Sequence, residues 1–244
     1  MNYNYTAQKG FRWNRFPKNH KKMRIFFFLI TLVVTAGFFI SGVVMLLARA
    51  LGQLSLNPQS AAWKRTLAKL RERIRKQAAK NLVPWDTEML GLLSTNRTII
   101  KKPGFFDLYS EGLYATIYQE PVLVYAALKT GKTSILVAST SDREFIFRQK
   151  DKEIEIWLNE QPLGLFVDGT LLAPGRGSKL LARMEATGTE ASLPVLIGDK
   201  TAAAITNPEQ ASGPNPRALT LLRTLDSNEE NALLALTILK MTKL

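Results

Sequence analysis

The longest apolar run of the sequence lies near the N-terminus, at residues 25–48, and contains no charged side chain. A helix rises about 1.5 Å per residue, so about 20 residues cross a hydrocarbon core of roughly 30 Å. A cleaved signal peptide is the main alternative. Its apolar core usually has only about 7–15 residues, and no clear small-x-small cleavage site ends this run. The pattern therefore predicts an uncleaved, single-pass transmembrane helix and a membrane localisation.

Basic residues flank this predicted span on both sides. On the C-terminal side, Arg49 is followed by a charge-free stretch that ends at Lys64. Basic residues concentrate on the cytosolic side of a span. The balance close to the span predicts a cytosolic N-terminus, although the nine basic residues within 49–80 favour the reverse. Residues 1–24 carry seven basic side chains and no acidic one, namely Lys9, Arg12, Arg15, Lys18, Lys21, Lys22 and Arg24.

A second helical pattern covers residues 60–81, which lack glycine and proline and are rich in strong helix formers. Trp63, Leu67, Leu70, Ile74 and Ala78 recur every three or four residues and form a narrow apolar stripe on a basic helix. Such a helix can lie on anionic lipid beside the span. Alternatively, the stripe packs on the following domain or on a second copy of the chain. The residues that we expect to contact anionic lipid are Lys64, Arg65, Arg71, Arg75 and Lys76.

From about residue 105 the pattern changes to short apolar runs separated by turn residues. Turns such as Asp168-Gly169 and Gly198-Asp199 tolerate the positive φ that tight hairpins need. A spacing of about 8–12 residues is typical of a β-sandwich or barrel. About twelve strands are predicted, at residues 105–109, 113–119, 122–128, 134–139, 144–149, 154–158, 164–167, 170–173, 179–185, 193–197, 202–206 and 218–225.

The last segment of the chain is a predicted helix. It opens with a capping sequence and two acids at residues 227–230, and residues 232–239 are apolar on every face. Eight helical residues reach only about 12 Å, which is too short to cross a bilayer. A helix that is apolar all round needs burial on all sides. The pattern predicts a helix threaded through a closed barrel, with a dimerising or membrane-dipping tail as the alternative.

This order of elements resembles the tubby-like C-terminal fold, which tubby proteins, phospholipid scramblases and LURP-one-related proteins share. The resemblance rests on residues 122–124, the DGT turn at 168–170 after GLF, the AAAITNP stretch at 202–208 and the ending at 217–239. It covers roughly residues 110–244 and implies a barrel of about twelve strands around a central hydrophobic helix. For some members it also implies phosphoinositide binding or involvement with membrane lipids.

The sequence departs from that family in two respects. Its predicted span precedes the domain, whereas scramblases carry theirs at the end, and it has neither their cysteine-rich stretch nor an acidic calcium-binding run. The lipid-binding basic residues of tubby have no matching positions here. The resemblance therefore carries over no lipid specificity.

The charge distribution separates the flanks of the span from the domain. The chain has 33 basic and 20 acidic residues and a formal charge of +13, but residues 81–244 carry 17 basic and 19 acidic ones. A nearly neutral domain does not favour nucleic acid as a partner. Cysteine is absent and His20 is the only histidine. These absences exclude cysteine–histidine and serine–histidine nucleophilic sites as well as thiolate metal sites.

Three short motifs have a structural explanation. GKT at 131–133 lacks the upstream glycine and the following helix of a phosphate-binding loop, and predicts a hairpin turn. GRGSK at 175–179 could hold a phosphate, but a solvated turn is the simpler interpretation. Asp151, Glu153 and Glu155 alternate along one strand and predict a polar, solvent-facing stripe. We therefore expect no catalytic residues, no metal site and no cofactor.

Together these patterns predict a basic N-terminal tail (1–24), a transmembrane helix (25–48), a basic amphipathic helical connector (49–104) and a tubby-like β-barrel domain (105–244). The predicted function is a membrane-anchored, non-catalytic module that binds lipid headgroups or a protein partner near the bilayer. One alternative is an assembly or scaffold subunit of a membrane complex, which includes a homo-oligomer. Another is a lipid-scrambling protein.

Overall fold

The computed structural model describes residues 20–54, 57–58, 60–78, 82–101, 109–130, 133–175, 177, 179–185 and 191–242. The chain separates into two compact units, Met1–Ala48 and Arg49–Leu244. The predicted fold class is confirmed: the described part of the chain is mainly β, with twelve strands around a C-terminal helix and three helices before the first strand. Residues 1–19, which form most of the predicted basic tail, lie outside the described part of the chain.

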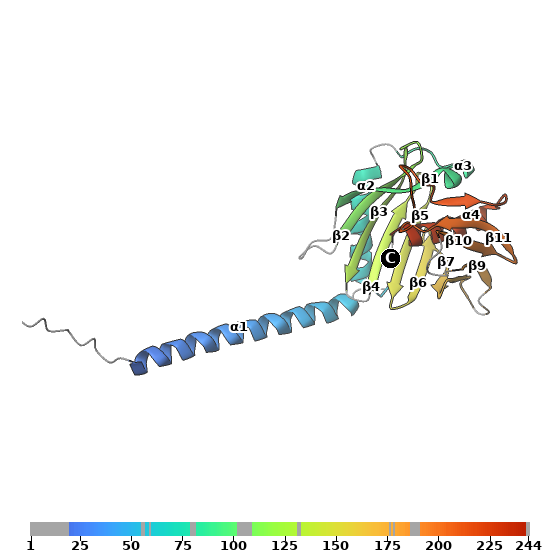
Figure 1. The fold of residues 1–244 in the computed structure, drawn as a ribbon. Coiled ribbons are helices and arrows are strands. Elements are labelled where there is room, and N and C mark those ends of the chain that lie inside the picture. Colours follow the sequence, from blue (N-terminus) through green and yellow to red (C-terminus); the bar gives the residue numbers. More distant parts are fainter. Residues whose placement is uncertain are drawn as a thin grey trace, which may run out of the picture. The chain divides into compact units, whose positions relative to one another are not determined.

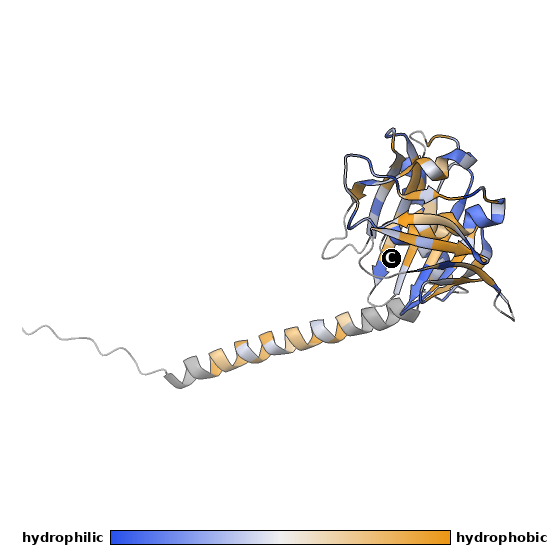
Figure 2. Cartoon of the chain, turned by 45° about the vertical axis from the view of Figure 1, so that its right-hand side comes forward, coloured by the Kyte–Doolittle hydropathy of each residue, from blue (hydrophilic) through white to orange (hydrophobic). Residues whose placement is uncertain are grey.

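Helix α1 (His20–Leu54) contains the predicted span. Its stretch Ile25–Met45 has a mean hydropathy of 2.4, is exposed along its length, and is by length and composition able to cross a membrane. Figure 2 shows hydrophobic residues along most of this stretch. The hydroxyls of Thr31 and Ser41 donate to the carbonyl four residues earlier, at 2.9 and 2.8 Å. These polar side chains are thus satisfied within the helix itself, as an apolar solvent requires.

Twelve antiparallel strands follow one another in sequence order around a single sheet (Figure 1). Each neighbour in space is also the neighbour in sequence, so the order of the described strands contains no crossover. The strands are β1 (Leu93–Lys101), β2 (Tyr109–Thr116), β3 (Pro121–Thr130), β4 (Thr133–Ser139), β5 (Glu144–Lys150), β6 (Glu153–Leu158), β7 (Gln161–Val167), β8 (Thr170–Leu172), β9 (Leu180–Met184), β10 (Ser192–Ile197), β11 (Lys200–Thr206) and β12 (Leu219–Leu221).

A short seam between the first and the last strand nearly closes this sheet into a barrel. Ser94 and Arg217 form an antiparallel bridge. Beside it, the Thr95 N–H donates to the Pro216 carbonyl at 2.9 Å, and the Ala218 N–H donates to the Leu93 carbonyl at 2.6 Å. Helix α3 (Thr87–Leu92) directly precedes β1 and packs against β12. The two ends of the sheet are therefore joined over a short segment, which covers part of the edge that an open sheet would expose.

Helix α4 (Ser227–Thr242) lies in the barrel core, as predicted. Every residue from Ala232 to Leu239 is buried, and these residues share one core cluster with inward-facing residues of the strands. The buried Tyr114 of β2 donates its hydroxyl hydrogen to the Met241 carbonyl at 2.8 Å, which satisfies one of the free carbonyls at the end of the helix. Between Ala232 and Leu239 the helix therefore has no face that is exposed to solvent.

The α4 N-terminus is held by a capping box. The Asp226 carboxylate accepts the N–H of Glu229 at 2.9 Å, and the Glu229 carboxylate accepts the N–H of Asp226 at 3.1 Å. The cap is thus Asp226, one residue before the predicted capping sequence. Arg223 donates two hydrogen bonds of 2.7 Å to Glu229. Together with the Asp226 N–H, they lower the pKa of Glu229 to about 2, so this carboxylate stays ionised in mild acid.

Helix α2 (Ala61–Ala78) packs on the outside of the barrel. It buries Trp63, Leu67, Leu70 and Ile74 against β3, β4 and β5 in a second core, separate from the one inside. These three strands therefore bury apolar side chains on both faces, toward the inner core and toward α2. On β4, for example, the side chain of Leu136 belongs to the inner core and that of Val137 to the outer one. The apolar stripe therefore packs on the domain, which was one of the alternatives that the sequence left open.

The structure corrects the predicted extent of the connector. Within residues 49–104, helix is described at the end of α1, in α2 and in α3, but the barrel already begins with β1 at Leu93. Residues 94–98 of β1 are polar and lack the alternating pattern of a half-buried strand, so the sequence pattern does not mark this strand. The strand predicted at 105–109 falls mostly outside the described residues, and its last residue, Tyr109, starts β2.

Candidate functional site

Two ion-pair clusters attach α2 to the barrel on either side of its apolar stripe. On one side, Arg71 donates from Nε to both oxygens of Glu144 at 3.0 Å, and from Nη2 to Glu144 at 2.6 Å and to Glu160 at 2.8 Å. On the other side, Arg73 pairs with the buried Glu111 and lies 4.3 Å over the Tyr109 ring. The hydrogen bond to Glu144 is the largest cause that raises the pKa of Arg71.

The outward face of α2 is strongly basic. It exposes five basic side chains and one acidic one, Glu72, which accepts a hydrogen bond from Lys76 at 2.8 Å. This bond and nearby arginines lower the pKa of Glu72. The structure places no ion pair between a described carboxylate and Lys64, Arg65, Lys69 or Arg75. We call this surface the basic face; its residues are Lys64, Arg65, Lys69, Arg75 and Lys76.

The structure brings together four of the five residues predicted to contact lipid. Lys64, Arg65, Arg75 and Lys76 share the basic face, whereas Arg71 turns toward the barrel and is occupied by two carboxylates. Lys69 was missed. The helical period could have identified it, because Lys69 lies four residues after Arg65 and so on the same side of the helix.

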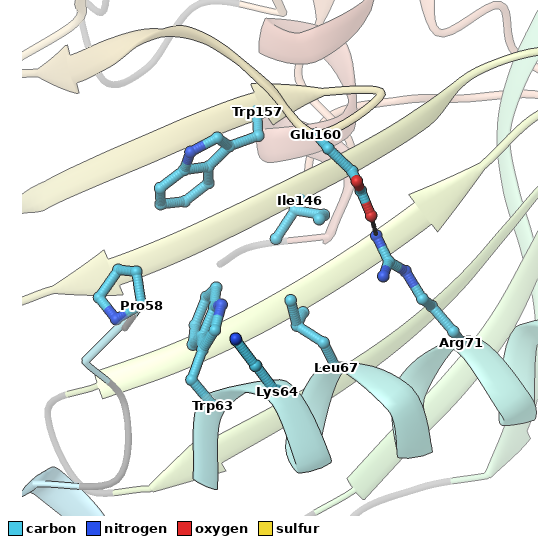
Figure 3. A pocket seen from close by; sticks show the side chains of 8 residues that line it. All are labelled: Pro58, Trp63, Lys64, Leu67, Arg71, Ile146, Trp157 and Glu160. Carbon is cyan, nitrogen blue, oxygen red and sulfur yellow. Dashed lines mark hydrogen bonds and ion pairs between the residues drawn. The ribbon is translucent and has the colours of Figure 1, made fainter. Parts of the chain in front are cut away.

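A groove of about 420 Å³ runs between α2 and strands β5 and β6 (Figure 3). Ile146 lies between Trp63 and Leu67 of the helix and Trp157 of the sheet, and the two tryptophan rings lie 6.0 Å apart between centroids. The Lys64 side chain reaches the groove beside Trp63, and the Arg71–Glu160 pair closes its far end. The eight lining residues are Pro58, Trp63, Lys64, Leu67, Arg71, Ile146, Trp157 and Glu160.

The described residues contain no group of three or more histidine, cysteine, aspartate or glutamate side chains that could hold a metal ion. The motif at 131–133 connects β3 to β4, which is the predicted hairpin, although Gly131 and Lys132 themselves lie outside the described residues. Asp151 occupies the β5–β6 turn with φ of 55°, and Glu155 pairs with Arg148. Two of the three acidic residues thus have a structural role: Asp151 forms a turn and Glu155 forms an ion pair.

Comparison with known protein families, with characterised proteins and with solved structures finds no match to this chain.

Proposed function

We propose that the protein is a membrane-anchored, non-catalytic module in which α1 spans the bilayer once and the basic face of α2 contacts anionic lipid headgroups. The observation that carries this proposal is the orientation of α2. The apolar stripe of α2 packs against the barrel. Five basic side chains of this helix, which follows the candidate span in the sequence, face outward.

The packing of α2 decides the kind of lipid contact. A free amphipathic helix binds by inserting its apolar face among the acyl chains, but Leu70 is fully buried in the outer core and Trp63 and Leu67 are nearly so. The contact that the basic face makes is therefore electrostatic, at the level of the headgroups. Each basic side chain near an anionic surface contributes about 1 kcal/mol, and this attraction is screened over about 10 Å in 0.1 M salt.

Vesicle binding tests this proposal. The unit Arg49–Leu244 contains both cores and lacks the candidate span, so its binding reports the module itself. We expect it to bind vesicles with phosphatidylserine or phosphatidylglycerol more tightly than vesicles of phosphatidylcholine. Exchange of the whole basic face to glutamine should weaken binding on the order of a hundredfold, because five contributions of about 1 kcal/mol are not fully additive.

The matched control removes five exposed basic side chains that lie outside α2: Lys129, Lys152, Lys179, Arg183 and Lys200. Both variants lose the same charge, so only a localised contact separates them. Equal weakening in the two variants, or binding that ignores both anionic lipid and salt, would remove the lipid function. A stable oligomer without lipid affinity would instead favour the assembly role and a protein partner.

The proposed topology has the N-terminus in the cytosol, which is supported by the basic residues that precede the span. Protease added to the non-cytosolic side of sealed membranes is then expected to digest Arg49–Leu244. Digestion only from the cytosolic side would reverse the orientation and bring α2 to the leaflet that is rich in anionic lipid.

Membership of the tubby-like superfamily also belongs to this proposal. A barrel of twelve sequential strands with a buried C-terminal helix supports it, as an architectural likeness. Lipid scrambling gains little support, because the described residues contain a single candidate span and one apolar helix offers no polar path across the bilayer.

A further inference from the structure

The groove between α2 and strands β5 and β6 combines an apolar floor with one lysine that forms no ion pair with a described residue. Trp63, Leu67 and Ile146 are 6%, 8% and 4% exposed and form its floor, while Pro58 and Trp157 are partly exposed at its side. A long apolar group lying along this floor would contact aromatic and aliphatic side chains on two sides. The groove therefore suits a hydrocarbon chain better than a small polar ion.

The charges around the groove leave Lys64 as the group that selects a ligand. Arg71 is balanced by Glu144 and Glu160, whose carboxylates accept its hydrogen bonds. Lys64 is exposed, has no ion pair with a described residue, and directs its side chain to the groove beside Trp63 (Figure 3). Lys64 is thus the positive group at the groove that no described carboxylate engages directly, and it lies at the end of the groove where α2 begins.

We infer that this groove holds the glycerol and upper acyl chain of one anionic phospholipid, with the lipid phosphate at Lys64. The inference rests on the proposed function and assigns a specific subsite to it. The position along the chain favours a lipid over a protein segment, because only residues 46–60 separate the candidate span from α2. Tryptophan and lysine together are also typical of side chains at the level of the headgroups.

This subsite differs physically from the basic face. The basic face attracts any anionic surface through summed charge, whereas the groove requires both a phosphate and an apolar chain. Removal of the Lys64 charge is expected to lower the occupancy of the groove about fivefold. Loss of Lys69, which belongs to the basic face but does not line the groove, should lower occupancy less than loss of Lys64, and loss of Lys200, which belongs to neither, should not change it.

The experiment uses the full chain in nanodiscs that contain phosphatidylcholine and a minor fraction of phosphatidylglycerol. Bromine atoms on the acyl chain of one lipid or the other quench tryptophan fluorescence on contact. The variant W13F/W85F keeps Trp63 and Trp157 as reporters of the groove. The variant W13F/W63F/W157F keeps Trp85, which lies away from the groove and donates to Glu230 at 3.0 Å.

We expect the groove reporters to be quenched more by brominated phosphatidylglycerol than by brominated phosphatidylcholine. In that background, K64Q should reduce the quenching by brominated phosphatidylglycerol about fivefold, K69Q should reduce it less, and K200Q should leave it nearly unchanged. The Trp85 reporter should respond to neither lipid. Excess inorganic phosphate or glycerol phosphate should not relieve the quenching, because neither carries the chain.

Several results would overturn the inference. Equal quenching by the two lipids, or an equal effect of K64Q and K69Q, would leave only general surface attraction. Quenching of Trp85 would indicate non-specific contact of the barrel with the disc, and relief by free phosphate would reduce the site to a headgroup contact. If neither lipid quenches the groove reporters, the occupant of the groove would be a protein segment instead of a lipid. In each case, binding of anionic vesicles by Arg49–Leu244 decides separately whether the basic face still functions.

Discussion

Replacement of Leu236 by lysine is expected to unfold the barrel. Leu236 is fully buried on α4, and both of its neighbours along the helix are also buried. A lysine there must either bury an ammonium group or discharge it, and no turn of the helix offers a path to solvent. This cost is comparable with the whole net stability of a typical domain, which is about 5–15 kcal/mol. Far-UV circular dichroism and urea unfolding of Arg49–Leu244 measure the loss.

Leu222 provides the matched control, because it is an exposed leucine that directly follows β12, with 58% of its surface accessible. L222K should change the free energy of unfolding by less than about 0.5 kcal/mol. A folded L236K protein with an unchanged urea midpoint would show that α4 does not lie in the barrel core. The comparison therefore tests the central feature of the fold without dependence on any ligand.

The position of α4 could be predicted because a closed barrel is the simplest way to bury its sequence, although a dimerising or membrane-dipping tail was also open. An apolar helix of eight residues that is too short to span a bilayer must be surrounded by protein, and a closed β-barrel surrounds it completely. The strands could be predicted for a similar reason, since their turns carry residues such as Gly169 and Gly198 at positive φ. Both signals are local in sequence.

The first strand could not be predicted, because its pattern depends on the seam. Residues 96–100 of β1 are exposed on both sides, so they lack the alternation of apolar and polar side chains that marks a half-buried strand. Ser94 is buried, but its hydroxyl donates to the Pro216 carbonyl at 3.1 Å. That partner is distant in the sequence, and a local pattern contains no information about it.

The sequence analysis did not decide which surface α2 packs against, although the sequence contains a signal for that surface. Residues 122–126 of β3 and 135–138 of β4 are buried without interruption, which is typical of strands that are covered on both faces. One cover is α4 on the inside. The other must be an apolar stripe outside the barrel, and the stripe of α2 is the one available. This reasoning would also have separated Arg71, next to the stripe, from the basic face.

The docking of α2 links the stability of the barrel to the proposed function. A free helix with this composition would insert its tryptophan and leucines into a bilayer and orient its lysines sideways. Docking on β3, β4 and β5 instead fixes the lysines and arginines on one outward surface, and creates the groove beside Lys64. In the proposed function, specificity for lipid would therefore depend on this packing contact as well as on charge.

Replacement of Glu230 by alanine is expected to lower the free energy of unfolding of Arg49–Leu244 by about 3 kcal/mol. Glu230 lies in the first turn of α4 and is 5% exposed. Its carboxylate accepts hydrogen bonds from Arg143 Nη1 at 2.7 Å and from Trp85 Nε1 at 3.0 Å. Loss of the carboxylate leaves a mostly buried guanidinium without its main partner, while Asp142, 3.3 Å from Arg143, compensates only in part.

A double-mutant cycle with R143A separates the ion pair from the packing of α4. If the unpaired guanidinium causes the loss, R143A/E230A should be more stable than the sum of the single changes predicts. E88A is the matched control, because Glu88 is also an acid in the first turn of a helix, but it is exposed. Its loss should cost no more than about 1 kcal/mol, which is the usual contribution of an acid at a helix N-terminus. Equal effects of E88A and E230A would mean that the Glu230 contacts add nothing beyond the helix dipole, and that α4 is held in the barrel by its apolar side chains alone.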